Sequence, residues 1–424
     1  MLKARLPVSP LLIAKLAFLA FFCAGATLCH AQTDSVVCSR GTGSFGIAFR
    51  TGVTVEVGAA RRDGLATRMC QATMGWDKRS LVVTDAAAQV DVDALGIDLG
   101  FGTPVVAFQV KRADADCCRT FLIYSLEKPP KLLRTITGGS FFSAADAELD
   151  GRIEIWTNDA ASAHEFYDPD VERPELAPTV VLRFVRGRLL DVTSQFRGYF
   201  DNEIAALRGQ LNSDDLREFK NSNGRLPPTA HFSPEDLRRS QNLERTKSGV
   251  LRIVCSYLYS GREQIAWNSL EEMWPAEDLN RIRAAILSAR TRGILAQVDG
   301  VSPPGPSRAG VTKVYDIRSQ SVEQPDIRLT RRIGPRSEPP IMPPVPILID
   351  RRAPEGQSEA NISGSEILLD LTIDSAGKVR SVQSADPLFD ASLKDATTRW
   401  KFVPAYNGRD PIASRVYLYV SPKR

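Results

Sequence analysis

The sequence predicts a multidomain α+β protein: a mainly-β N-terminal domain, a helical subdomain, a Pro-rich linker and a small ββαβ C-terminal domain. Three observations lead to this prediction. A chain of 424 residues is too long for one ordinary core and favours two or three domains. The apolar spacing changes from strand-like to helical near residue 193, and two proline clusters set the last segment apart. The composition, with 43% hydrophobic and 25% charged residues, is that of a globular protein.

Residues 1–31 are typical of a secretory signal peptide. Lys3, Arg5 and Lys15 precede the apolar run LAFLAFFCAGATLC, and small residues lead to Ala31, after which we expect cleavage. A retained N-terminal anchor is the alternative, although about fourteen apolar residues fall short of the roughly twenty that a spanning helix needs. Cleavage predicts the periplasm or cell envelope of a Gram-negative-type bacterium; retention predicts an inner-membrane anchor.

Removal of the leader lowers the net charge and the number of cysteines. Three cations leave with it, so the formal charge falls from +4 to +1 (4 − 3 = 1), which predicts no nucleic-acid partner. An exported chain can form disulfides, and an odd number of cysteines leaves at least one thiol unpaired. We expect the adjacent pair to face opposite sides of a strand rather than form a bridge. The five remaining cysteines are Cys38, Cys70, Cys117, Cys118 and Cys255.

Residues 32–193 form the mainly-β domain. Short runs of β-branched and aromatic residues alternate with Gly, Asp and Pro: GVTVEV, SLVVT, TPVVAFQV, TFLIYSL, RIEIWT and TVVLRFV. The runs lie too close together for crossover helices, so antiparallel pairing in a sandwich or propeller-like sheet is expected.

Residues 194–300 form the helical subdomain. Ser233 followed by Pro234 predicts a helix start, because serine caps the free N–H groups and proline suits the first turn. Val250, Leu251, Val254, Tyr257 and Leu258 mark a buried helix. A second apolar stripe indicates a helix that ends at Gly293; it consists of Leu279, Ile282, Ile286 and Ala289.

Residues 301–349 form the linker. The clusters VSPPGPS and SEPPIMPPVP carry few large aromatic residues and favour extended polyproline geometry. We therefore expect a tether with no core of its own.

Residues 350–424 show the pattern strand, strand, helix, strand. Ile367, Leu369, Leu371 and Ile373 alternate along the first strand, and a turn at Asp374–Gly377 leads to the second through Val379 and Val382. The helix carries Phe389, Leu393, Ala396 and Trp400 at helical spacing. Asn407-Gly408 then predicts a tight turn before a last strand from Ile412 to Val420.

This segment resembles the C-terminal domain of the TonB family. The shared features are a glycine before the first strand, an Asp-x-x-Gly turn, a Trp-x-Phe-x-Pro run and a glycine hairpin; here they are Gly364, Asp374, Gly377, Trp400, Phe402, Pro404 and Gly408. The resemblance implies a protein-interaction module linked to TonB-type transmembrane transport, without chemistry of its own. Its partner would be an envelope protein or an outer-membrane receptor peptide that adds a strand to the sheet. The matching docking strand carries Arg415, Val416, Tyr417, Leu418 and Tyr419.

The leader departs from the family. TonB proteins that work with a motor of the ExbB/ExbD type carry Ser and His one turn apart in a membrane helix. Here Ser9 lies outside the apolar run and His30 lies at its end. A motor partner is therefore expected only if the N-terminus is retained as an anchor.

An acidic loop offers a possible calcium site, although no cofactor is otherwise required. Asp146, Glu148, Asp150 and Glu154 stand at positions 1, 3, 5 and 9 of a calcium-type loop, with Gly151 at position 6. The loop lacks the glutamate of position 12, and an acidic β-turn is the alternative. If calcium binds, it should raise the melting temperature of residues 32–300.

The sequence predicts no enzymatic activity. His164 and His231 lie in no nucleophile, zinc or phosphate-loop motif, and Trp156, Trp267 and Trp274 are expected in cores rather than in a ligand cleft. The alternative function is an exported hydrolase or carbohydrate-active protein whose large domain is the active unit.

Overall fold

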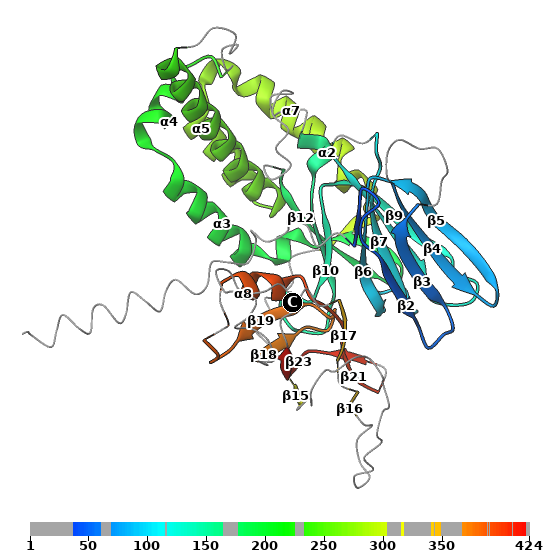
Figure 1. The fold of residues 1–424 in the computed structure, drawn as a ribbon. Coiled ribbons are helices and arrows are strands. Elements are labelled where there is room, and N and C mark those ends of the chain that lie inside the picture. The colour runs from blue at the N-terminus through cyan, green and yellow to red at the C-terminus, as the bar shows by residue number, and fades with distance from the viewer. Residues whose placement is uncertain are drawn as a thin grey trace, which may run out of the picture. The chain divides into compact units, whose positions relative to one another are not determined.

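The computed structural model is a mixed α+β fold (Figure 1). It describes residues 37–60, 69–114, 117–163, 177–224, 233–302, 315–317, 341–342, 344–348, 367–387, 389, 391–408 and 410–420. The leader, Gly364, His164 and His231 lie outside the described residues. Of the helices within the described ranges, none is both long enough and apolar enough to cross a membrane.

The N-terminal β region consists of three consecutive four-stranded antiparallel meanders, the unit from which propeller blades are built. The first contains β2 (Phe45–Ala48), β3 (Thr54–Ala59), β4 (Cys70–Trp76) and β5 (Arg79–Ala87). The second contains β6 (Gln89–Ile97), β7 (Val105–Lys111), β8 (Arg119–Ser125) and β9 (Leu132–Gly139), with β1 (Cys38–Ser39) added beside β6. The third contains β10 (Phe142–Ala145), β11 (Glu154–Asn158), β12 (Thr179–Val185) and β13 (Arg188–Asp191).

All six predicted runs lie on strands, and the expected antiparallel pairing is confirmed. The intervening strands, such as β4 and β6, were not among the predicted runs. A disulfide between Cys38 and Cys70 joins β1 to β4, and Cys255 stays a buried free thiol. The prediction for the adjacent pair was wrong: Cys117 is bonded to Cys118, just before β8 begins.

The helical region spans residues 193–297. Its α-helices are α3 (Arg197–Gln210), α4 (Ser213–Lys220), α5 (Pro234–Tyr259), α6 (Glu263–Met273) and α7 (Leu279–Arg292), with short 3-10 helices η3 (Thr193–Gln195), η4 (Ala276–Asp278) and η5 (Ile294–Gln297). The short helix α2 (Ala160–Ala163) lies outside this region, between β11 and β12. The predicted capping at Ser233 is confirmed, because its side chain accepts from the Asp236 N–H in a reciprocal capping box. Helix α7 ends at Gly293, as its sequence predicts.

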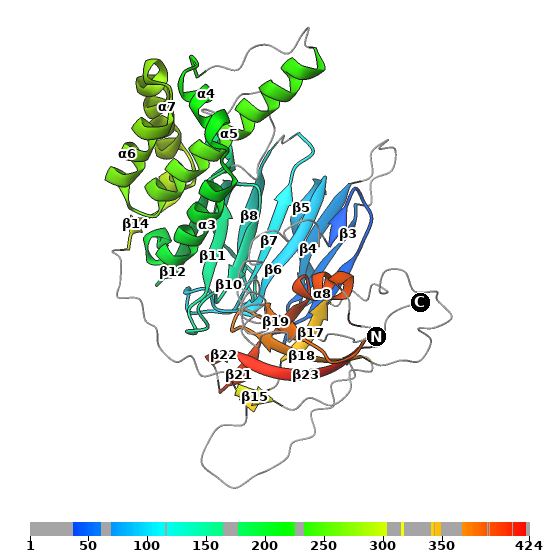
Figure 2. The same ribbon diagram turned by 90° about the vertical axis from the view of Figure 1, so that its left-hand side faces the viewer.

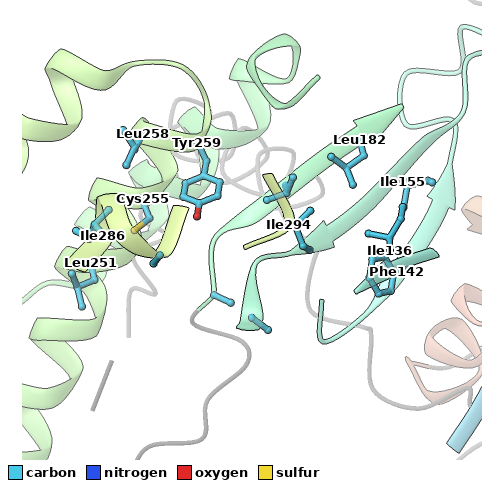
Figure 3. Packing of buried hydrophobic residues seen from close by; sticks show 14 of the residues in the cluster. Ile136, Phe142, Ile155, Leu182, Leu251, Cys255, Leu258, Tyr259, Ile286 and Ile294 are labelled. Atoms are coloured by element: carbon cyan, nitrogen blue, oxygen red, sulfur yellow. The ribbon is translucent and has the colours of Figure 1, made fainter. Parts of the chain in front are cut away.

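One core joins the helices to the second and third meanders. Leu251, Cys255 and Leu258 of α5 face Ile286 of α7, and strand residues such as Ile155 belong to the same buried cluster (Figure 3). Strand β14 (Gly300–Val301) pairs in parallel with β13 and returns the chain to the third sheet. The helices are therefore packed on the sheets rather than separate from them.

The C-terminal module has a four-stranded sheet in the order β15-β23-β18-β19. Its elements are β18 (Ile367–Ile373), β19 (Val379–Gln383), α8 (Ala391–Thr398), β20 (Lys401–Val403), β21 (Ala405–Asn407), β22 (Asp410–Ile412) and β23 (Ser414–Val420). The predicted strand–strand–helix–strand order is present, and Trp400 and Phe402 are buried in the core of the module. The expected last strand is divided at Ala413 into β22 and β23 (Figure 2).

The linker also contributes strands that pair with the C-terminal module. Three short strands within residues 301–349 pair with the module: β15 (Tyr315–Ile317) with β23, β16 (Ile341–Met342) with β21, and β17 (Val345–Leu348) with β20. The described residues between 37 and 420 belong to one compact unit. The expectation of a purely extended linker was wrong at these strands, because edge strands of the module provide unpaired N–H and C=O groups.

Candidate functional site

Strand β23 presents two different faces. Val416 and Leu418 are 2% and 3% exposed and lie in the core of the module, so two of the five predicted docking residues point inward. Tyr419 is 41% exposed and lies directly opposite Leu368 of β18, which is 39% exposed. The period-2 alternation of a strand produces this division.

Arg415 and Tyr417 share the outer face with Tyr419. The Arg415 Nε donates to the Asp370 carboxylate at 2.9 Å, and its guanidinium lies 5.7 Å from the centre of the Tyr417 ring. The hydrogen bond from Arg415 holds the pKa of Asp370 below its ordinary value. Strand β23 thus offers an aromatic, charged face beside a regular backbone ladder.

The edge of β23 away from β18 is partly paired. Strand β15 runs parallel to it, with Tyr315, Asp316 and Ile317 opposite Ser414, Arg415 and Val416. On its other side β23 pairs with β18 along its whole length. The predicted docking edge therefore accepts a strand from the linker of the same chain.

The acidic loop lies between β10 and β11. Asp146 and Glu154 are buried, whereas Glu148 and Asp150 are exposed. The Asp146 carboxylate accepts the backbone N–H groups of Asp150 at 2.8 Å and Gly151 at 2.9 Å, and Glu154 binds Arg183 of β12. These hydrogen bonds fold the loop into a turn in which Asp146 and Glu154 are bonded to groups of the protein.

The charges of Asp146 and Asp150 nevertheless act on the two glutamates of the loop. Burial raises the pKa of Glu154 to about 7 against the opposing effect of Arg183, and Asp150 and Asp146 raise it further. Burial and Asp150 likewise raise the pKa of Glu148. Within the described ranges no three His, Cys, Asp or Glu side chains are arranged to hold a metal ion. The calcium site stays a prediction.

The same loop contacts the C-terminal module. Ser375 Oγ donates to Asp146 Oδ2 at 2.7 Å, and the Asp146 N–H donates to Asp374 Oδ2 at 3.1 Å. Arg380 donates to the carbonyl oxygen of Ala147 at 3.2 Å. Ala376, at the tip of the Asp374–Gly377 turn, belongs to the core cluster of the meanders and helices, which together precede the linker and are called the large domain below. The Asp374–Gly377 turn of the module therefore packs against the β10–β11 loop.

The geometry of the turn fixes this insertion. Asp374 Oδ1 accepts the N–H groups of Ala376 and Lys378, both at 2.9 Å. Gly377 has a φ of +80°, and a Cβ there would lie 1.9 Å from the carbonyl oxygen of Phe402. Only glycine suits that position. Burial raises the pKa of Asp374 to about 7, with backbone hydrogen bonding opposing the shift and Asp146 adding to it.

A second set of contacts pairs lysines of the module with carboxylates of β6. Lys378 Nζ lies 2.5 Å from Asp93 Oδ1, and Lys401 Nζ lies 2.8 Å from Asp91 Oδ1. Lys401 also donates to the carbonyl oxygen of Val92. Burial alone would raise the pKa of Asp93, but Lys378 and Lys401 hold it below its ordinary value. Tyr406 adds a neutral bond of 3.0 Å to the carbonyl oxygen of Gly96.

These contacts form a buried polar interface that the sequence prediction missed. We call it the docking interface, and its residues are Asp91, Asp93, Asp146, Asp374, Ser375, Lys378, Arg380, Lys401 and Tyr406. One signal was present in the sequence: VDVDALGI places Asp91 and Asp93 on the same side of a strand whose neighbours are apolar. Two buried carboxylates on one face of a strand require partners.

The tryptophans are structural. Trp274 is fully buried and donates to Asp278 at 2.9 Å, and Trp267 donates to Glu263 at 3.1 Å within α6. Trp156 packs against Phe196 and Tyr199. The prediction that these side chains lie in cores is confirmed for Trp267 and Trp274.

Comparison with known proteins adds no assignment. No family model matches the chain, and neither a curated protein nor a solved structure matches it. The resemblance of residues 350–424 to the TonB family therefore stays a prediction from the sequence motifs.

Proposed function

We propose that this protein is an exported cell-envelope binding protein whose TonB-like C-terminal module receives a partner segment by strand addition at β23. The partner is an envelope protein or an outer-membrane receptor peptide, in keeping with the family resemblance. A link to TonB-type transport through a motor requires the N-terminus to remain as an anchor.

The observation that supports the proposal is the strand-accepting edge of β23. Its register with β15 runs from Ser414 to Val416, so the backbone in this region is already regular enough to continue a ladder. Main-chain hydrogen bonds supply affinity in strand addition, and side chains of alternate residues supply selectivity. The outward residues Arg415, Tyr417 and Tyr419 are suited to that second role, because aromatic and arginine side chains dominate protein–protein contacts.

The docking interface gives the large domain a role in this function. It binds the module at the Asp374–Gly377 turn, where Ser375 contacts Asp146. It also binds the module through Lys378, which pairs with Asp93, and Lys401, which pairs with Asp91. The large domain then serves as a platform that presents β23, and no catalytic step is proposed for it.

Site-specific photo-crosslinking in cells tests the proposal. A photoreactive amino acid at Tyr419 should form an adduct with one envelope protein, whereas the same group at Leu287 of α7, which is similarly exposed, should not. Equal adducts from both positions, or none from Tyr419, would contradict strand addition at β23.

A further inference from the structure

The β15 strand lies outside the module that it completes. It is separated from the first strand of the module, β18, by the two other linker strands, β16 and β17. Those two pair antiparallel with β21 and β20, in other sheets. Of the three described linker strands, β15 is the one that pairs with β23, and among the described strands of this sheet it is the one that runs parallel to its neighbour.

This pairing has the geometry of strand addition. An extended segment from outside a domain lies on an exposed sheet edge and continues its ladder. The segment contributes three residues, Tyr315–Ile317, opposite Ser414–Val416. Edge strands that lack such a cover attract unwanted pairing with other chains, so a cover supplied by the same chain protects the edge.

We infer that β15 is an internal occupant of the partner-binding edge of β23, and that a partner binds by replacing it. The inference rests on the proposed function, since it assigns the regulation of that same edge. The partner that fits is an extended peptide segment that runs parallel to β23, in the direction of β15.

The balance of affinities permits this exchange. A three-residue ladder contains few hydrogen bonds, and each makes only a modest net contribution because it replaces hydrogen bonds to water. The connection through the linker raises the local concentration of β15 to the order of millimolar, which holds a weak strand in place. A partner that pairs with more of β23 than β15 does can overcome that advantage, whereas short chance contacts cannot.

Hydrogen–deuterium exchange on the full chain tests the inference. Asp316→Pro combined with Ile317→Pro removes the N–H donors of two successive β15 residues, which point to opposite sides of the strand, so one of the two lost donors faces β23. The matched control is Met342→Pro, which alters β16 and leaves β15 intact. The probe is a synthetic peptide of residues 311–320 added in trans.

We expect amide exchange in residues 414–416, the part of β23 that β15 covers, to be about tenfold faster in the Asp316→Pro/Ile317→Pro chain than in the wild type or the control. The peptide should restore protection in that variant and have no effect on the wild type. Unchanged exchange in the variant would show that β15 does not cover the edge, and faster exchange without rescue by the peptide would show that the edge accepts no strand in trans. Either result overturns the inference.

The two proposals fail separately. If exchange is unchanged but the crosslink from Tyr419 forms, the edge binds partners without an internal occupant. If the proline substitutions speed exchange and the peptide restores protection, but no crosslink forms at Tyr419, the internal pairing is real and the proposed partner binding is wrong.

Discussion

The two halves of the docking interface use carboxylates in opposite ways. On β6, Asp91 and Asp93 each face a lysine of the module, so buried negative charges meet buried positive charges. At the β10–β11 loop, the Asp146 N–H donates to Asp374, and burial together with the Asp146 charge raises the pKa of Asp374 against the opposing charges of Arg380 and Lys378. The contacts of Asp91 and Asp93 are stable when these carboxylates are ionised. The contacts of Asp146 and Asp374 become more stable when one of the two carboxyl groups takes up a proton.

The difference predicts opposite responses to pH. Asp93 has a lowered pKa in the folded protein, so its contribution is present above about pH 4 and is lost as the pH falls through the folded value. Asp374 has a pKa raised to about 7, so its contribution is complete below about pH 4 and is lost as the pH rises through 7. The interface should therefore be strongest in mildly acidic solution.

The largest effect should follow removal of a lysine. Lys378→Met leaves Asp93 buried without its ion-pair partner, which should lower the free energy of unfolding by about 3–5 kcal/mol. Denaturant unfolding at pH 7 measures the change. Lys394→Met, at an exposed position of α8, is the control and should be nearly neutral. Equal effects of the two substitutions would show that the Asp93 pair does not hold the module.

Substitution in the turn should be the next largest. Gly377→Ala forces a side chain into a left-handed conformation and against the Phe402 carbonyl oxygen, and should cost about 2–3 kcal/mol. Gly408→Ala also adds a Cβ at positive φ, but in the β21–β22 hairpin away from the loop contacts. Thermal unfolding of both variants compares backbone strain in an ordinary hairpin with backbone strain at the docking turn. Only Gly377→Ala should also weaken the hydrogen bond between Ser375 and Asp146.

Acid titration should separate the two halves. Unfolding free energy should fall by about 1–2 kcal/mol between pH 5 and pH 8 as Asp374 and its neighbours ionise. In the Asp374→Asn chain the slope should be smaller, whatever the absolute stability, because the titrating group is gone. An unchanged slope would assign the pH dependence to Glu154, whose pKa is also raised to about 7.

The neutral contact should contribute less than either charged half. Tyr406→Phe removes the hydroxyl that donates to Gly96 and should cost about 1 kcal/mol. Tyr419→Phe, on the exposed face, should change the unfolding free energy by less. A larger loss from Tyr419 would indicate that the outer face of β23 is covered in solution.

Calcium should give the smallest effect. Asp146 is the first residue of the predicted calcium loop and also the acceptor for Ser375, so the ion and the module would compete for the same carboxylate. Millimolar calcium should raise the melting temperature slightly, and more in Ser375→Ala than in the wild type. The absence of any shift in both chains would remove calcium from the account of this loop.

Much of the local structure could be predicted from the sequence, because it depends on short-range periodicity. The capped start of α5 at Ser233, the end of α7 at Gly293 and the alternation of β18 are all confirmed. Each results from contacts within a few residues of the chain. The same holds for the turn at Gly377, whose positive φ follows from its Asp-x-x-Gly pattern.

The docking interface could not be predicted in this way, because its partners lie far apart along the chain. Lys401 and Asp91 are separated by 310 residues, and nothing in either local pattern identifies the other. The linker strands were missed for a related reason. Strand β15 has only three residues, which is too few for a strand period to be recognised in the sequence. It pairs with the edge of β23, a partner far away along the chain.

Cleavage of the linker tests most directly whether the module is held on the large domain. A protease site inserted between residues 320 and 338 would leave β15 on the large fragment and β16 to β23 on the small one. After cutting at pH 6, both fragments should elute together on size exclusion, and Lys378→Met combined with Lys401→Met should separate them. Separation of the wild-type fragments under the same conditions would contradict the docking interface.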